Sequence, residues 1–164
     1  MSRLIVAFIG IGLVAVGILI GFSVWWTRGA HMELSGQILK VRLHPADESS
    51  AIAILDFRFT NPADYRFVVR AVRVVLRGKD GAEVEGDVIS DVDIRRVFDY
   101  FPALGQKYNE TLMAREKIAP KHTLDRMISA RFDLPESALS ERQAFLIRVE
   151  EIDGVVSEIA EKRP

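Results

Sequence analysis

Residues 51–62 have the sequence AIAILDFRFTNP, which indicates the fold class more directly than any other stretch of the chain. Apolar side chains alternate with more polar ones through this stretch, as in a β-strand with one buried face. The expected buried face consists of Ala53, Leu55, Phe57 and Phe59. The expected polar face consists of Asp56, Arg58 and Thr60. The Asn61-Pro62 pair is a turn signal and predicts the end of the strand.

Further strands are predicted on both sides of this one, because short runs rich in Val, Ile and Phe are separated by turn signals. They are expected at residues 36–43, 82–89, 124–133, 143–151 and 155–160, with a short strand around Thr111–Arg115. With residues 65–77 included, about seven main strands over ~125 residues match the spacing of an immunoglobulin-like sandwich. The predicted fold is mainly β: an N-terminal transmembrane helix followed by an immunoglobulin/fibronectin-like antiparallel β-sandwich with a short helical insertion.

Residues 65–77, YRFVVRAVRVVLR, support two interpretations. Four arginines recur at helical spacing, and Asn61-Pro62 could cap a helix. Five Val residues and two aromatic residues in this segment, with a Lys79-Asp80-Gly81 turn just after it, favour a strand. We favour the strand, with a bulge near Ala71-Val72 that brings the arginines to one face.

The arginine row, defined as Arg66, Arg70, Arg73 and Arg77, is a candidate contact for anionic lipid or a partner protein. Basic side chains are attracted to anionic headgroups. The alternative is a solvated strand face that acidic residues on neighbouring strands neutralise.

A helical insertion is predicted after the fourth strand. Ser90-Asp91-Val92-Asp93 has the features of a helix N-terminus, and Pro102 ends the helix. The expected apolar face consists of Ile94, Val97, Phe98 and Phe101. The apolar residues Tyr100, Phe101 and Leu104 would either cap the core or form a contact patch, and we favour capping because large exposed apolar patches are rare. If the domain has a soluble contact, we place it at residues 90–104, with Tyr100, Phe101 and Leu104 as its candidate residues.

The N-terminal segment from Leu4 to Trp26 is apolar throughout, LIVAFIGIGLVAVGILIGFSVWW. As a helix it would be about 34 Å long, against a bilayer hydrocarbon core of roughly 30 Å. Trp25, Trp26 and Arg28 would lie at the membrane interface. A cleaved signal peptide is the competing interpretation, but its apolar core would be shorter and would end in a small-residue site. We therefore predict an uncleaved anchor.

The orientation of this anchor is set by its flanks. Basic residues are nearly balanced, with Arg3 on one side and Arg28, Lys40 and Arg42 on the other. A very short tail before one long domain is the layout of a signal anchor. We expect a single-pass membrane protein with its C-terminal domain on the extracytoplasmic side.

Gly10, Gly17 and Gly21 fall on one face of the predicted membrane helix, and Gly17 and Gly21 form a GxxxG match. Small residues let a second helix approach closely, so this face is a candidate packing site for a membrane-protein partner. The alternative is that these residues reflect the high frequency of Gly in transmembrane helices.

Several segments together carry a family resemblance: Phe57-Arg58-Phe59-Thr60-Asn61-Pro62, the Val-rich strand with its Gly turn, Ala130-Arg131-Phe132-Asp133-Leu134-Pro135, and a closing strand at Asp153-Gly154. This pattern resembles the water-stress and hypersensitive-response (WHy-type) late-embryogenesis-abundant domain over residues 34–160. The resemblance implies a fibronectin-like β-sandwich, often carried behind a single membrane helix, with a binding, protective or lipid-associated role. Residues 90–122 depart from the family pattern, and the family brings no catalytic residues.

The composition favours a non-enzymatic role. The chain has 22 Lys+Arg, 23 Asp+Glu and no Cys, so its net charge gives no reason to expect nucleic acid as a partner. His31, His44 and His122 have no patterned nucleophile or ligand partner, and we predict no catalytic, metal or cofactor site. Asp87, Asp91 and Asp93 do not have calcium-loop spacing.

The sequence thus predicts a transmembrane anchor at residues 1–26, a linker at 27–37, a β-sandwich domain at 38–160 and a tail at 161–164. The expected function is an interaction or scaffolding module in a membrane assembly. Its partners would be the lipid bilayer and a membrane protein. The alternative function is a lipid-binding or lipid-handling module at the membrane surface.

Overall fold

The structure is a computed structural model that describes residues 16–17 and 33–163. Within residues 33–163 the strands are β1 (Ser35–Pro45), β2 (Ala51–Thr60), β3 (Phe67–Arg77), β4 (Glu83–Val88), β5 (Lys117–Ile118), β6 (Thr123–Phe132), β7 (Ala144–Glu151) and β8 (Val156–Ala160). The helices of this range are α2 (Asp91–Tyr100), a 3₁₀ turn η1 (Pro102–Leu104) and α3 (Glu136–Ser140). The mainly β prediction is confirmed.

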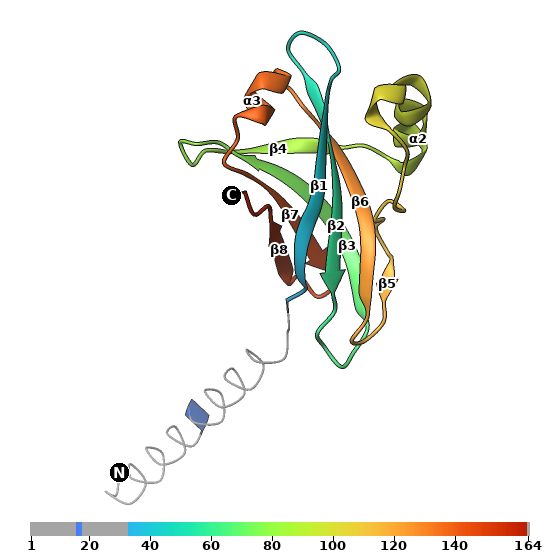
Figure 1. Cartoon of the computed structure of the whole chain (residues 1–164). Coiled ribbons are helices and arrows are strands. Elements are labelled where there is room, and N and C mark those ends of the chain that lie inside the picture. The colour runs from blue at the N-terminus through green and yellow to red at the C-terminus, as the bar shows by residue number, and fades with distance from the viewer. Residues whose placement is uncertain (1–15, 18–32, 164) are drawn as a thin grey trace, which may run out of the picture. The chain divides into compact units, whose positions relative to one another are not determined.

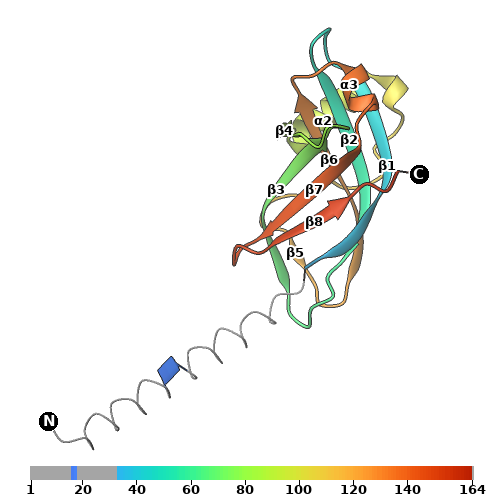
Figure 2. The same ribbon diagram turned by 90° about the vertical axis from the view of Figure 1, so that its left-hand side faces the viewer.

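The strands form one antiparallel, curled sheet in the order β1-β2-β6-β4-β3-β7-β8, with β5 paired to β3. Strands β1, β2 and β6 lie side by side in Figure 1, and β3, β7 and β8 lie side by side in Figure 2. The main hydrophobic core takes side chains from both of these groups, including Phe57, Phe59, Phe145 and Ile147. The curl therefore brings the two groups of strands around a common core.

Strand β4 connects the two groups of strands. It pairs with β3 up to Gly86 and with β6 at Asp87 and Val88. A side chain at Gly86 would meet the ring of Phe132 at 2.6 Å, so only glycine allows the ring to pack directly on this backbone. The absence of a side chain at Gly86 lets the sheet bend at the point where β4 changes partner.

Strand β2 is buried on both faces from Ala51 to Phe57, which corrects the prediction of a polar outer face there, whereas Arg58 is exposed as predicted. Asp56, expected in solvent, is only 4% exposed. The reason is a second hydrophobic cluster outside the sheet, where α2 and η1 cover β2 and β6. This cluster consists of Ile52, Ile54, Ile94, Phe98, Leu104 and Met127.

Residues 67–77 form a strand, so the helical interpretation of this segment is wrong and the favoured one is confirmed. The pairing of β3 with β7 shifts register between Val69 and Ala71, which places the irregularity at Arg70, close to the predicted bulge. Arg66, Arg70 and Arg73 are exposed, and Arg77 is partly exposed. Pairing with two neighbouring strands overrides the helical spacing of the arginines.

The short strand predicted at Thr111–Arg115 is wrong, because the strand lies at Lys117–Ile118. Thr111 forms a single parallel bridge to Met127. The chain then turns at Arg115, whose φ of 68° is in the left-handed region, and the next residues reach β3. Two hydrogen bonds with the Val69 backbone hold this turn in place.

The domain extends beyond the predicted bounds of 38–160 at both ends. Leu34 is 3% exposed, and its backbone N–H donates to Ser157 Oγ at 2.9 Å. At the other end, the backbone N–H of Glu161 donates to the carbonyl of Phe145 at 2.8 Å. Part of the predicted linker and part of the predicted tail therefore belong to the folded domain.

Within residues 16–17 and 33–163, no helix has the length and apolar character needed to cross a membrane. Of the predicted membrane segment, only Val16 and Gly17 are described, and both are helical and exposed. A Cβ atom at Gly17 would meet nothing within 4 Å. Gly10, Gly21, Trp25, Trp26 and Arg28 lie outside the described residues.

Candidate functional site

One end of the domain collects the loops next to the residues where the N-terminal segment joins. The pairing register places Ser35 opposite Thr60, and Thr60 opposite Thr123. The loops at this end therefore include residues 61–66 and 119–122, and the β7–β8 turn at 152–155 also lies here, at the bottom of Figure 1. We call this surface, formed by residues 33–34, 61–66, 117–122 and 152–156, the tether end.

Asn61 holds two loops of the tether end together. Its side chain is fully buried, and its Nδ2 donates to the carbonyls of Tyr65 at 2.8 Å and Ala119 at 3.2 Å. Its Oδ1 accepts a hydrogen bond from the backbone N–H of Ala63 at 3.0 Å, as in an Asx turn. The Asn-Pro pair that sequence analysis treated as a simple turn signal is therefore a buried joint between two loops.

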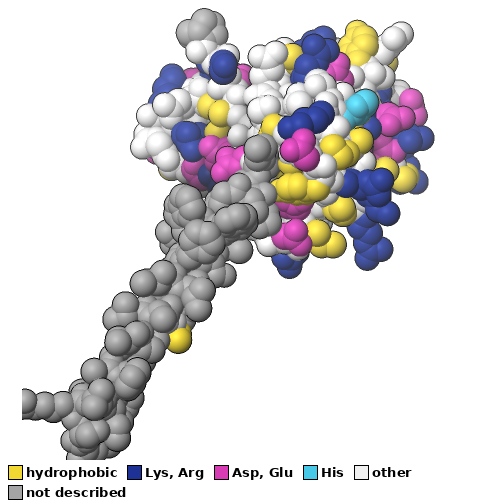
Figure 3. Space-filling view, turned by 90° about the horizontal axis from the view of Figure 1, so that it is seen from below, with side chains coloured by type: hydrophobic (Ala, Val, Ile, Leu, Met, Phe, Trp, Pro, Cys, Tyr) yellow, Lys and Arg dark blue, Asp and Glu magenta, His cyan; other side chains and the backbone are white. Residues whose placement is uncertain are grey.

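Apolar and basic side chains are both exposed at the tether end. Ile152 is 61% exposed, Tyr65 is 39% exposed, and Arg66, Lys117 and Lys121 are exposed basic residues. Figure 3 views the domain from below and shows hydrophobic side chains next to Lys and Arg side chains, with acidic groups among them. This combination is typical of surfaces that meet both apolar and anionic groups.

The basic residues of the tether end differ in how they are paired. Lys121 Nζ lies 3.1 Å from Asp64 Oδ1. Arg66 and Lys117 form no ion pair with any residue in the described part of the chain. Val68 is opposite Lys117 in the β3–β5 pair, and Arg66 immediately precedes β3, so the two basic residues belong to the same end of this strand pair.

The rest of the arginine row belongs to a charged network on the outer face of β3, β4, β7 and β8. Arg70 lies 3.2 Å from Glu150, Arg73 lies 3.9 Å from the same carboxylate, and Arg77 lies 2.8 Å from Glu83. Acidic residues of neighbouring strands thus partly neutralise three of the four arginines, as the alternative interpretation expected. Arg66 is the member of the row that lies at the tether end.

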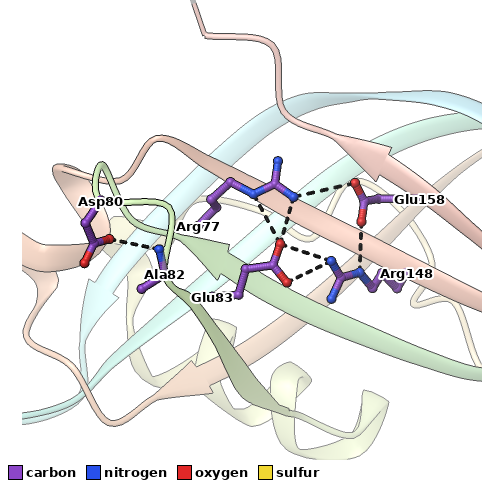
Figure 4. A network of polar contacts seen from close by, with 6 residues as sticks. All are labelled: Arg77, Asp80, Ala82, Glu83, Arg148 and Glu158. Carbon is purple, nitrogen blue, oxygen red and sulfur yellow. Dashed lines mark hydrogen bonds and ion pairs between the residues drawn. The ribbon is translucent and has the colours of Figure 1, made fainter.

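Figure 4 shows the centre of this network, where Glu83 lies between Arg77 and Arg148. Hydrogen bonds from Arg77 and Arg148 lower the pKa of Glu83. Glu158 and Glu83 in turn raise the pKa of Arg148. The charges satisfy one another, so this face offers little unpaired positive charge to a ligand.

The candidate soluble contact at residues 90–104 contains both exposed and buried side chains. Tyr100 is 81% exposed, whereas Phe101 is half-buried with its ring centroid 4.1 Å from that of His44. Leu104 is only 6% exposed and packs in the second hydrophobic cluster, so it caps the core, as the favoured alternative expected, and is not available as a surface contact. The reason is that Ile52 and Ile54 need a cover on the outer face of β2, and η1 supplies part of it.

A buried ion pair under the insertion was missed by sequence analysis. Arg42 Nη2 donates to Asp56 Oδ2 at 2.7 Å, and Arg42 Nη1 donates to the carbonyls of Leu104 and Gln106 at 3.0 and 2.9 Å. Asn109 Nδ2 donates to the other oxygen of Asp56 at 2.9 Å. The position of Asp56 directly after the apolar run Ala51–Leu55 was the signal that could have revealed this pair, because buried carboxylates need a partner.

The groove between α2 and the loop after η1 has a volume of about 380 Å³ and contains Asp91. Lys107 Nζ lies 2.7 Å from Asp91 Oδ1, and Thr111 Oγ1 donates to the same oxygen at 2.6 Å. These hydrogen bonds, that of Lys107 foremost, lower the pKa of Asp91 to about 2. The contacts with Lys107 and Thr111 therefore favour the ionised form of Asp91.

Within the described residues, no group of three or more His, Asp or Glu side chains is placed to hold a metal ion. Comparison of the chain with protein-family models, with curated proteins and with solved structures found no match.

Proposed function

We propose that this chain is a single-pass, membrane-anchored, non-enzymatic interaction module that presents an immunoglobulin-like β-sandwich next to the bilayer. The observation that supports this most is the short distance in sequence between the apolar run and the fold. Seven residues, 27–33, separate Trp26 from the buried Leu34. Seven extended residues span at most about 25 Å, so an anchor at residues 4–26 would keep the tether end near the membrane.

A non-enzymatic role fits the way polar side chains are used in the described domain. Arg42 and Asp56 join the insertion to the sheet, and Asp91 joins α2 to the following loop. Glu83 belongs to the charged network between strands. These groups serve the architecture, which leaves the exposed surface as the part of the domain that would carry function.

The proposed contact for a partner protein is the outer side of α2 and its C-terminal end. Tyr100 is 81% exposed and Val92 is 61% exposed on this ten-residue helix. Large exposed aromatic side chains are often anchors of protein interfaces. The helix rests on a buried cluster, so it would present these side chains on a rigid support. Within the membrane, Gly10, Gly17 and Gly21 would pack against a partner helix.

The sandwich assignment, the location and the family resemblance are parts of the same proposal. Two groups of strands around one core are what an immunoglobulin-like or WHy-type sandwich requires. The location in this proposal is that of a single-pass membrane protein with its C-terminal domain on the extracytoplasmic side.

The second candidate function is lipid binding at the membrane surface. The main core is filled by large side chains that are no more than 1% exposed, such as Phe57, Phe67 and Phe145. Lipid would therefore bind on the exterior rather than inside the domain. The exposed apolar and basic residues of the tether end favour this candidate.

One experiment on the full chain tests the first proposal. Membranes would carry the chain with a photoreactive amino acid in place of Tyr100, or in place of Lys79 as an exposed control. Cross-linking before an alkaline carbonate wash should give a discrete product from position 100 only, and the chain should stay in the pellet.

The anchor has its own variants. Val14→Arg with Ile18→Arg should release the chain from the pellet, since each arginine costs about 3 kcal/mol at a helix centre. The control, Val14→Leu with Ile18→Leu, should not release it. Release of the unaltered chain would refute the anchor, and equal products from both positions would refute the α2 contact.

A further inference from the structure

We infer that the tether end docks on the headgroup surface of a bilayer that contains anionic lipid, with Ile152 inserted between headgroups and Arg66 and Lys117 beside lipid phosphates. This inference rests on the proposed function, because it requires the anchor. It adds a specific surface, a specific orientation of the domain and a class of lipid.

The connection to the anchor makes the bilayer the expected occupant of this surface. The fold begins at Leu34, whose hydrogen bond to Ser157 fixes it beside β8. Residues 27–33 can span at most about 25 Å from the end of the apolar run. That distance is similar to the diameter of a small domain, so the end that carries Leu34 is the one the anchor keeps closest to the lipid.

Ile152 is held at the tip of a rigid turn. Its backbone N–H donates to the carbonyl of Val68 at 3.0 Å, which ties the tip to β3. Gly154 has a φ of 88°, and its N–H donates to the carbonyl of Glu151 at 2.9 Å. These hydrogen bonds fix the backbone on both sides of Ile152. Its side chain is 61% exposed on this fixed turn. An apolar side chain held in this way gains most by insertion into an apolar layer.

Basic side chains lie close to this tip. Val68, which accepts the hydrogen bond from Ile152, is paired with Lys117 in the β3–β5 ribbon. Arg66 lies two residues before Val68, immediately before β3 begins. The two basic residues are thus placed beside Ile152 and are free of ion pairs within the described domain. They match the negative charge of phosphatidylserine or similar lipids.

Acidic residues also lie at the tether end, and they limit the strength of the contact. Asp64 is paired with Lys121, while Glu33 and Asp153 are exposed. Docking should therefore be weak for a free domain and effective only because the anchor holds the domain at the surface. It should also weaken as salt concentration rises, because salt screens exposed charges.

The test uses the full chain, which contains no cysteine, so one introduced cysteine gives a single labelling site. Ile152→Cys would carry an environment-sensitive fluorophore, and Val92→Cys would carry the same fluorophore on α2 as a control. The two positions are matched, since both native side chains are 61% exposed. The chains would be reconstituted in phosphatidylcholine vesicles with or without phosphatidylserine, with a nitroxide quencher on the lipid headgroups.

We expect quenching at position 152 that increases with phosphatidylserine and decreases with salt, and little quenching at position 92. Arg66→Glu with Lys117→Glu should lower the ratio of docked to undocked domain at least about 25-fold, since each lost basic residue accounts for about 5-fold and anionic lipid also repels each introduced carboxylate. Lys79→Glu with Arg96→Glu makes the same change in net charge away from the tether end and should have little effect.

Equal quenching at positions 152 and 92, or quenching at 152 that ignores phosphatidylserine and salt, would overturn the inference. Absence of quenching at position 152, which is expected if a protein partner rather than lipid covers the tether end, would also overturn it. Failure of the anchor is distinguishable, because a chain without an anchor would not remain with the vesicles in an alkaline carbonate wash.

Discussion

Arg42 and Asp56 form a buried ion pair, whereas Arg58 and Asp125 form an exposed pair of nearly the same length. The shortest N–O distances are 2.7 Å and 2.6 Å. The side chains of the first pair are 8% and 5% exposed, and those of the second are 53% and 37% exposed. The two pairs therefore differ in burial. Loss of one partner leaves the other charge in water in the exposed pair, but in the protein interior in the buried pair, where an unpaired charge is strongly destabilising.

At the scale of single residues, we expect Arg42→Met to lower the free energy of unfolding by about 3–5 kcal/mol, because Asp56 would remain buried without its cation. Arg58→Met should lower it much less, since water replaces the lost partner. Chemical denaturation of the full chain in detergent would measure both values. Equal losses for the two variants would contradict the view that burial decides the contribution.

At the scale of elements, helix α2 is positioned by its N-terminus and by its apolar face. Ser90 Oγ accepts a hydrogen bond from the backbone N–H of Asp93 at 3.2 Å and so caps the helix. Ile94 and Phe98 face the outer cluster over β2. Asp91 lies in the first turn, where a negative charge is favourable, and it contacts Lys107 and Thr111 of the loop that follows η1. The carboxylate thus connects the start of the helix to the return of the chain.

The pH dependence of this connection has a defined sign. The pKa of Asp91 falls from 3.8 to about 2 in the fold, so its ionised form is the one that stabilises the domain. That stabilisation is complete above 3.8 and is lost as the pH falls toward about 2. Carboxyl-carbon NMR of the full chain in detergent micelles would follow the titration. Lys107→Met should raise the pKa of Asp91 more than Thr111→Val does, because the lysine is the larger cause. The reverse order would show that the hydroxyl, not the ammonium group, dominates.

At the scale of the whole molecule, the described domain is closed by contacts at both of its chain ends. Leu34 is bonded to β8, and Glu161 is bonded to the start of β7. Arg142 Nη2 lies 2.6 Å from Glu161 Oε1, with side-chain exposures of 7% and 10%. The C-terminal residues therefore act as part of the fold rather than as a tail.

We expect Glu161→Ala to destabilise the domain by about 3–5 kcal/mol, because it leaves Arg142 buried without a partner. Lys162→Ala, one residue later and exposed, should change stability by no more than about 0.5 kcal/mol. Thermal unfolding of the full chain in detergent, followed by circular dichroism, would compare the two. A small effect of both substitutions would mean that the C-terminal residues are dispensable.

Local patterns were sufficient for most strands and for α2. The strand at 51–60 was predicted with the bounds that the structure has, and the helix was placed correctly by Ser90 at its start and Pro102 at its end. These signals depend on neighbours in sequence, such as alternation, capping and turn residues, so they can be read without knowing the fold. The arginine row, which includes Arg66, was likewise recognised from the spacing of its members in sequence.

Only the tertiary structure decided the roles that depend on distant partners. Asp56 was placed on the polar face of its strand, and two uses were open for Leu104, but α2 and η1 cover the outer face of β2 and bury both residues. The tether end is defined by loops separated by many residues in sequence, so neither Lys117 nor Ile152 could be associated with Arg66 beforehand. The physical reason is that alternation tells which side chains share a face of a strand, whereas burial and charge pairing depend on what the rest of the chain places against that face.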